Sequence, residues 1–305
     1  MAIIPDNVVT LRDGRALGYA EWGDPDGAPV LHFHGSPSSR LEGAMPELDA
    51  VAARLRIRVL APERPGLGLS DPKPHRTILD WPADVLEFAD ALGLSRFSVY
   101  GASGGGPYAA ACAYRIAHRL RAAGIVCGLA PMTVPEARRG MHRRVRLQFF
   151  LGRHAPWLLR RLVRRMATEM TLHGSRIIAD MMKQLPEPDR LIYADPARQQ
   201  RAVAVAREAF RRGEEGAYVD LLLASRPWGF ELNQVPMVVN LWFGGRDVAV
   251  PESAGRYLAR ALARSEARFY PDEGHASLLI NRYEDVLTGL TATAAREGDK
   301  SIVEW

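Results

Sequence analysis

The sequence predicts an α/β protein whose sheet is interrupted in the chain by a helical insertion. Strand-like and helix-like segments alternate over residues 1–131 and again over residues 234–305. Residues 132–233 have helical periodicity and no convincing strand pattern. A glycine-rich turn, GASGG at 101–105, directly follows a strand-like run. Together these observations predict a mostly parallel eight-stranded sheet flanked by helices, with one antiparallel strand near the start and an all-helical insertion.

The composition is ordinary for a soluble globular protein. The chain has 305 residues, of which 47% are hydrophobic and 25% are charged, so it can bury a sizeable core. Its two cysteines, Cys112 and Cys127, lie in apolar surroundings and are interpreted as small core residues. The N-terminus lacks the pattern of a secretory signal, and no apolar run reaches the ~18 residues that a membrane helix needs. A cytoplasmic protein is therefore expected.

The first part of the chain predicts a hairpin followed by alternating strands and helices. The hairpin pairs residues 8–14 with 15–24 and turns at Asp13-Gly14. Further strands are expected at 29–35, 56–66, 96–103 and 120–131, and helices at 40–55, 78–94 and 107–119.

The later part returns to the same alternation. Within the helical block, Pro156 is suited to a first helical turn, and Asp195 precedes Pro196 as a helix cap. Strands are then expected at 235–247 and 267–275, with a helix at 251–263 and one final helix at 276–296.

The turn at 101–105 matches the pattern Gly-x-Ser-x-Gly between a predicted strand and a predicted helix. A sharp turn of this kind strains the backbone of Ser103 and lifts its hydroxyl out of the sheet. Gly101 and Gly105 fit because side chains at these two positions would clash. Ser103 is therefore the candidate nucleophile. A phosphate-binding loop is disfavoured, since the lysine of GxxxxGK[ST] is missing.

A serine nucleophile needs a base, and the base needs an orienting acid. His275 follows the last predicted strand and Asp247 follows the strand before it, which completes the order serine, acid, histidine. Open α/β sheets place their sites at the carboxyl ends of such strands. Asp272 and Glu273 precede the histidine in its own loop and are alternative acids, and Asp220 is a weaker one. Asp247 is preferred because its loop faces the histidine loop across the sheet edge.

Acyl transfer also needs N–H donors for the developing oxyanion. The backbone N–H of Gly104 is one candidate, and that of Ser36, in the loop after the third strand, is the other. No metal or organic cofactor is required. His32 and His34 point to one side of their strand, but no carboxylate or cysteine at ligand spacing accompanies them, so no metal site is predicted.

These motifs resemble those of the α/β-hydrolase superfamily. The matching pieces are HGSPSS at 34–39, ERPGLGLSD at 63–71, GASGG at 101–105, GGRDVAVP at 244–251 and EGH at 273–275, and they span nearly all of the predicted core. The resemblance implies a hydrolase core, residues 1–131 and 234–305, and a helical cap, residues 132–233. It also implies that ERPGLGLSD is mainly a structural loop, and it assigns Arg64 no chemistry.

We expect a serine hydrolase that cleaves carboxylic esters of small to medium, largely apolar substrates through an acyl-enzyme. Dehalogenases and epoxide hydrolases of this superfamily carry an aspartate nucleophile, so Ser103 argues against those activities. The HGGPG motif of proline iminopeptidases is absent. The alternatives are an amide, as in an aminopeptidase, a lactone or a C–C bond cleaved by the same residues, and a ligand-binding receptor on the same scaffold.

The basic excess behind the net charge of +5 lies in the predicted cap. Only Glu136 and Glu169 oppose ten arginines over one stretch, at 138, 139, 143, 144, 146, 153, 160, 161, 164 and 165. A solvated helix face is the favoured interpretation, and contact with an anionic lipid membrane surface or an acidic substrate is the second. No nucleic-acid-binding motif accompanies the arginines. The expected partner is a small-molecule substrate, and the sequence does not predict an oligomeric state.

Overall fold

The computed structural model describes residues 6–300, with side chains described through residue 296. Its centre is an eight-stranded sheet in the order β1-β2-β4-β3-β5-β6-β7-β8. The strands are β1 (Asn7–Thr10), β2 (Ala16–Gly23), β3 (Ala28–Phe33), β4 (Ile57–Pro62), β5 (Phe97–Ala102), β6 (Leu120–Val126), β7 (Val239–Gly244) and β8 (Ser265–Tyr270). Strand β2 runs antiparallel to β1 and β4, and the other neighbours are parallel. The predicted fold class is therefore confirmed.

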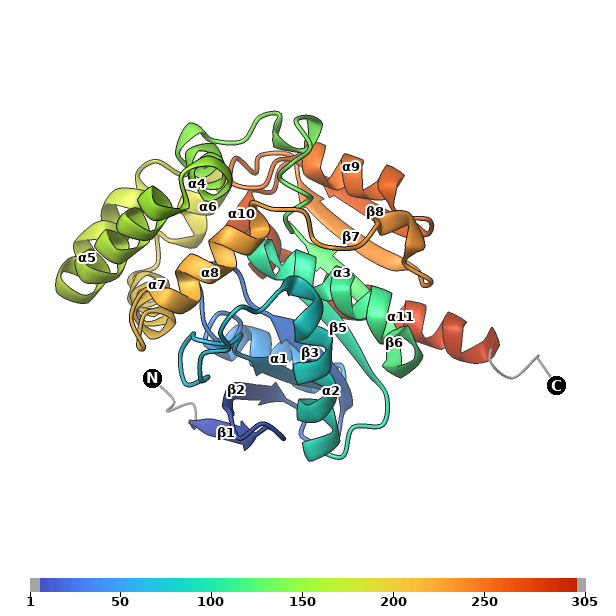
Figure 1. Ribbon diagram of the computed structural model, residues 1–305. Helices are drawn as coiled ribbons and strands as arrows, with labels where there is room; N and C mark the ends of the chain where they lie inside the picture. The colour runs from blue at the N-terminus through green and yellow to red at the C-terminus, as the bar shows by residue number, and fades with distance from the viewer. Residues whose placement is uncertain (1–5, 301–305) are drawn as a thin grey trace.

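Helices cover both faces of this sheet (Figure 1). Alternate side chains of a strand point to opposite faces, so Leu60 joins one apolar cluster while Val59 joins the other. The first cluster includes α2 (Trp81–Ala91), α3 (Gly106–Arg115) and α9 (Glu252–Ala261). The second includes α1 (Pro46–Arg54) and α11 (Tyr283–Lys300). The sheet is thus buried between two helical layers, which leaves its strand ends as the place for a site.

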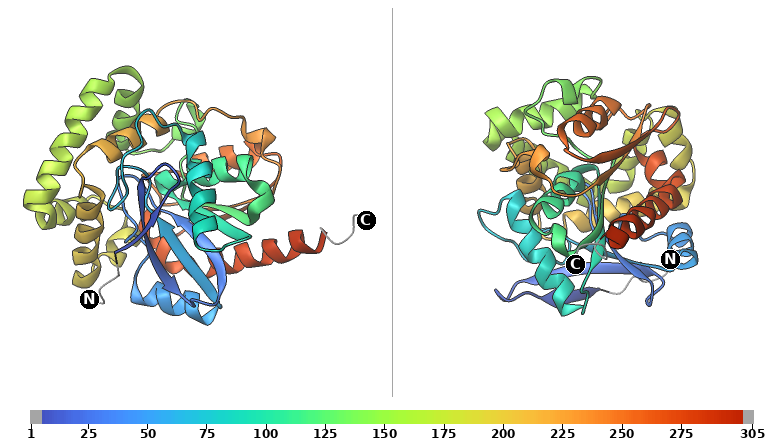
Figure 2. Two further views of the ribbon diagram at one scale, coloured as in Figure 1. Left: turned by 60° about the horizontal axis from the view of Figure 1, so that its bottom comes forward. Right: turned by 90° about the vertical axis from the view of Figure 1, so that its right-hand side faces the viewer.

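Residues 132–233, between β6 and β7, contain helices and no strand. The helices are α4 (Arg143–His154), α5 (Pro156–Met182), α6 (Glu187–Ile192), α7 (Pro196–Ala209) and α8 (Glu215–Ala224). Figure 2 shows this group, from here on the helical insertion, on the side of the molecule opposite the end of α11. Pro156 opens α5 and Asp195 caps α7 by accepting from the Ala197 N–H, as predicted.

Two helical predictions were wrong at their boundaries. Residues 40–45 precede α1, which begins only at Pro46, because the loop uses Glu42 to bind the Gly35 N–H. The expected final helix is two helices, α10 (His275–Asn281) and α11. The break falls where Asn281 and Arg282 turn their side chains to the buried Glu273 carboxylate. Short 3₁₀ segments lie at Ile78–Asp80, Ser103–Gly105, Ala117–Arg119, Glu136–Arg138 and Leu232–Gln234.

Part of the basic surface of α5 is paired within the helical insertion. Arg160 forms an ion pair with Glu215 at 2.7 Å, and Arg164 forms one with Glu214 at 2.9 Å. Across residues 6–300, every helix is too short or too polar to cross a bilayer.

Candidate active site

Ser103 lies at the junction of β5 and α3. Its φ is 51°, a left-handed conformation that a residue with a side chain adopts only under constraint. A methyl group on Gly101 would strike the Gly105 carbonyl oxygen, and one on Gly105 would strike the Phe33 carbonyl oxygen. Only glycine therefore fits on either side of this turn. The turn presents Ser103 half-buried at the carboxyl end of the sheet.

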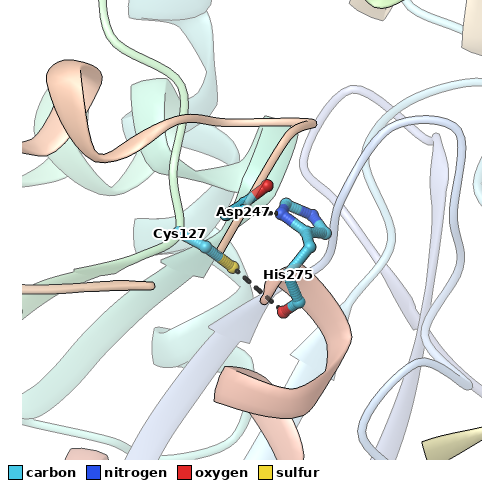
Figure 3. Close-up of side chains that lie close together, drawn as sticks. All are labelled: Cys127, Asp247 and His275. Carbon is cyan, nitrogen blue, oxygen red and sulfur yellow. Dashed lines mark hydrogen bonds and ion pairs between the residues drawn. The ribbon is translucent and has the colours of Figure 1, made fainter. Parts of the chain in front are cut away.

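His275 and Asp247 form a hydrogen-bonded pair after strands β8 and β7 (Figure 3). His275 is the first residue of α10, after β8, and its Nδ1 lies 2.6 Å from Asp247 Oδ2. Asp247 follows β7 and is buried, and its Oδ1 accepts from the N–H groups of Ala249 and Val250 at 2.7 and 2.8 Å. These bonds fix the carboxylate, so it can hold the imidazole in one orientation.

The Asp247 carboxylate also controls the charge of His275. Burial alone disfavours the imidazolium, but the adjacent carboxylate outweighs burial and raises the pKa of His275 well above its usual value. The alternative acids lie elsewhere. Glu273 binds Asn281 and Arg282, and Asp272 is exposed.

Ser103 and His275 line one cavity of about 820 Å³. Residues at the strand ends form its floor, and residues of α4, α5 and α7 form the opposite wall. In the described part of the chain, the serine and histidine side chains share this cavity without a direct hydrogen bond. Such bonds are often long before substrate binds.

The loop after β3 brings Ser36 beside Gly104. A methyl group on Gly104 would lie 2.9 Å from the Ser36 nitrogen, and one on Gly35 would lie 3.3 Å from Ser103 Cβ. The Gly35 N–H is already used, because it donates to the Glu42 carboxylate at 3.0 and 3.1 Å. Within residues 6–300, the Ser36 N–H has no acceptor. Of the two loop amides, that of Ser36 is therefore the one available to a ligand.

Arg64 determines which way that amide points. Its guanidinium donates to the carbonyl oxygens of His34 at 2.6 Å and Gly35 at 2.7 Å, and to Ser36 Oγ at 2.8 Å. The Gly35–Ser36 peptide is trans, so its C=O and N–H point in opposite directions. Because Arg64 binds the C=O, the N–H points away from Arg64. The sequence analysis expects Arg64 to belong to a structural loop and does not predict this contact with residues 34–36.

Asp220, from α8, holds Arg64 in turn. It lies 2.6 Å from Arg64 Nη2 and 2.6 Å from Arg76 Nη2, and it accepts from Ser36 Oγ at 2.8 Å and Tyr108 Oη at 2.9 Å. Burial alone would raise the pKa of Asp220, but the two guanidinium groups outweigh burial and lower it. The sequence predicts Asp220 only as a weak alternative to Asp247 as the acid that orients His275. Its partners come from three distant segments, so no local sequence pattern identifies its role.

A second carboxylate of the helical insertion binds the histidine loop. Asp189, from α6, is buried and accepts from the N–H groups of His275 at 3.0 Å and of Ala276 and Ser277 at 2.9 Å. Carboxylates are stabilised at such a helix start by the unsatisfied amides. The sequence analysis did not predict this role, because nothing in the local sequence distinguishes Asp189, in the first turn of α6, from a solvated acidic residue.

The groups that resemble metal ligands are already occupied. Cys127, Asp247 and His275 offer ligand atoms within 4.8 Å of one another. Asp247 already binds the imidazole, and burial raises the pKa of the Cys127 thiol, which disfavours the thiolate that a metal needs. His32 binds Glu42 at 3.1 Å, while His34 Nδ1 lies 2.8 Å from the Gly35 carbonyl oxygen. These side chains fit a hydrogen-bonded site better than a metal centre.

The model of the alpha/beta hydrolase family matches residues 30–288. The chain belongs to this family, which confirms the resemblance and supports a hydrolase. A proline iminopeptidase of Neisseria gonorrhoeae is 32% identical over 111 residues, 35% of this chain and 34% of that protein. Haloalkane dehalogenase 2 of Mycobacterium tuberculosis (strain ATCC 25618 / H37Rv) is 40% identical over 105 residues, 33% of this chain and 35% of that protein. These matches span about a third of each relative's length.

Solved structures extend the likeness in fold to nearly the whole chain. The enol-lactonase from Burkholderia xenovorans LB400 has a TM-score of 0.69 at 19% identity and covers 94% of this chain and 100% of its own. An esterase from Thermogutta terrifontis has a TM-score of 0.65 at 22% identity and covers 98% of this chain and 100% of its own. At these identities the likeness shows a shared fold.

Proposed function

We propose that this chain is a serine hydrolase that cleaves carboxylic esters through an acyl-enzyme. One observation carries the proposal: Ser103, strained at its turn, opens into the same cavity as His275, whose imidazole is bonded to the buried Asp247. A nucleophile, a base and an orienting acid at the carboxyl ends of three strands of one sheet are what acyl transfer requires.

The chemistry proceeds in two halves. His275 removes the hydroxyl proton as Ser103 Oγ attacks the ester carbonyl, and the developing oxyanion accepts from the N–H groups of Ser36 and Gly104. The proton then passes from His275 to the leaving alcohol, and the acyl group remains on Ser103. Water attacks this ester with His275 again as base, which releases the carboxylic acid. Asp247 stabilises the imidazolium in both halves.

The lining of the cavity supports an apolar acyl group. Most of the wall contributed by α5 is apolar, including Leu162, Met166, Met170, Ile177 and Ile178. We further propose that residues 132–233 act as a cap, since α4, α5 and α7 close the cavity over the strand ends. Burial of apolar substrate surface there contributes roughly 25 cal/mol per Å².

Hydrolysis of p-nitrophenyl esters from acetate to laurate tests the proposal, with wild type and Ser103→Ala measured side by side. We expect turnover that peaks at one chain length and falls by roughly 10⁵-fold or more in the variant. Full activity in folded Ser103→Ala would refute the mechanism. Wild type that reacts with a fluorophosphonate but cleaves none of these esters would indicate an amide, lactone or C–C substrate, or a receptor.

A further inference from the structure

Arg201 is a half-buried cation on the wall of the reaction cavity, and two of its guanidinium nitrogens have no partner in residues 6–300. It lies on α7, which packs against α5 (Figure 1), and its side chain lines the same cavity as Ser103. Its Nε and Nη2 atoms are sealed from solvent and have no hydrogen-bond partner in residues 6–300. The third nitrogen, Nη1, is not sealed.

Other charged groups of the cavity are either bonded or more exposed. Arg198 pairs with Glu47 at 3.2 Å, and Arg144 donates to Gln184 at 2.9 Å. Glu42 is engaged by His32 and the Gly35 amide. Arg165 is exposed on α5, and Glu169, also on α5, is half-buried and lies beyond ion-pair distance of Arg201. Arg201 therefore differs from the other arginines of the cavity, because its Nε and Nη2 atoms are sealed from solvent and have no partner.

Sealed guanidinium N–H groups without acceptors are unfavourable unless an anion joins them. Arginine stays protonated in proteins, so it cannot escape the cost of burial by losing its charge. Partial burial lowers the pKa of Arg201, and the charge of Glu47, which opposes this shift, does not cancel it. A carboxylate in the cavity would supply the missing charge and strong charge-assisted hydrogen bonds.

We propose that Arg201 binds a carboxylate on the substrate, so that the ester cleaved at Ser103 carries a free acid at its other end. This inference rests on the proposed ester hydrolysis and narrows its substrate class to monoesters of dicarboxylic acids with an apolar chain. The chain would lie along Met170 and Ala206, which line the cavity with Arg201. A monoanion is favoured over a phosphate dianion, since the neighbouring Arg198 is already paired with Glu47.

Matched substrates test the assignment. The probes are mono-p-nitrophenyl esters of succinate, adipate, suberate and sebacate, each compared with its methyl-capped diester. Wild type should prefer the free acid over the diester by about 10- to 100-fold in kcat/KM at one chain length. Arg201→Met should remove that preference through a higher KM for the free acid. Equal preference in wild type and Arg201→Met, or a wild type that favours the diester at every length, would overturn the proposal.

Arg165→Gln is the matched control. This variant also removes a cavity-lining arginine, but an exposed one, and it should keep the preference for the free acid. An equal loss in both variants would mean that general positive charge, and not Arg201, attracts the substrate, which would also overturn the assignment. Thermal unfolding checks the fold, and Arg201→Met should melt no lower than wild type because it removes a partly buried charge that has no ion-pair partner.

Failure of ester hydrolysis can be told apart from failure of the Arg201 site. If no ester is cleaved and no fluorophosphonate reacts, the proposed function falls. Calorimetric titration of Ser103→Ala with monomethyl suberate and dimethyl suberate then tests Arg201 without turnover. Binding of the acid alone, lost in the Ser103→Ala/Arg201→Met double variant, would sustain the carboxylate site. If the acid binds equally well with and without the Arg201→Met substitution, the carboxylate site is refuted.

Discussion

Asp220 accepts a hydrogen bond from Ser36 Oγ at 2.8 Å, and this contact joins helix α8 of the helical insertion to the loop beside Ser103. The same carboxylate lies 2.6 Å from the Arg64 guanidinium, which binds the Gly35 carbonyl. A helix that is distant from Ser36 along the chain thus controls the orientation of the Ser36 amide. Asp220 and Arg64 act here as positioning residues.

Asp220→Asn should destabilise the protein and slow it. The substitution leaves Arg64 and Arg76 buried without their counter-ion, which costs about 3–5 kcal/mol in comparable sites. Urea unfolding measures this loss. The matched control is Glu214→Gln, which breaks the more exposed pair with Arg164 and should cost less than ~1 kcal/mol. Equal costs for the two variants would contradict a buried network.

Arg64→Lys should lower kcat and leave KM nearly unchanged. A lysine keeps the charge but cannot bridge the carbonyl oxygens of His34 and Gly35 as the planar guanidinium does. The Ser36 amide would lose its orientation, and loss of one oxyanion donor costs on the order of 10²–10³-fold in kcat. Steady-state kinetics on the best p-nitrophenyl ester provides the test. A change confined to KM would mean that Arg64 serves binding and not the oxyanion.

Ser103→Gly should remove activity while leaving the protein as stable as wild type or more so. Glycine adopts the φ of 51° without strain, whereas serine there costs roughly 1 kcal/mol or more. Thermal unfolding should therefore rank Ser103→Gly at or above Ser103→Ala, which keeps a β-carbon. A clearly lower melting temperature for the glycine variant would argue against stored strain at this turn.

Activity and stability should change with pH in opposite directions. Because Asp247 raises the pKa of His275, the imidazole becomes a neutral base at a higher pH than an ordinary histidine does, and kcat/KM should rise through that raised pKa. The ion pair contributes stability that is fully present below the ordinary histidine pKa and is lost as pH rises through the folded-state pKa.

Asp247→Asn tests the pH dependence of both the activity and the stability. It should shift the acid limb of the kcat/KM profile to lower pH and reduce kcat on the order of 10³–10⁴-fold. It should also flatten the dependence of the unfolding free energy on pH between the pKa of His275 in the unfolded state and its raised pKa in the folded state. An acid limb that stays in place after the substitution would assign it to another group.

Asp189→Asn should lower kcat more than a stability loss explains. Asp189 binds three amides around His275, so the substitution loosens the base as well as a helix start. Asp195→Ala is the control, because Asp195 caps α7 at 2.9 Å and touches no site residue. Loss of that cap should cost ~0.5–2 kcal/mol. Only Asp189→Asn should reduce kcat. An equal kcat in the two variants would mean that Asp189 has only a structural role.

Local patterns in the sequence predicted most of the core. Strand–helix alternation, the glycine pattern around Ser103 and the order of Asp247 and His275 along the chain are all local signals, because each reflects a turn or a strand end. The two misplaced helix boundaries arise where side chains bind other segments. Glu42 holds the loop before α1, and Glu273 separates α10 from α11.

By itself, the sequence determined the fold class and the identities of the candidate nucleophile, acid and base, since steric and periodic constraints act over a few residues. The tertiary structure alone decided how the helical insertion reaches the site. Asp189 and Asp220 look like any acidic residue in a helical block, and Arg201 looks like one of many arginines. Their roles depend on burial and on partners more than eighty residues away in the chain or, for Arg201, on the lack of one. Long-range packing creates those conditions, and no short-range pattern encodes them.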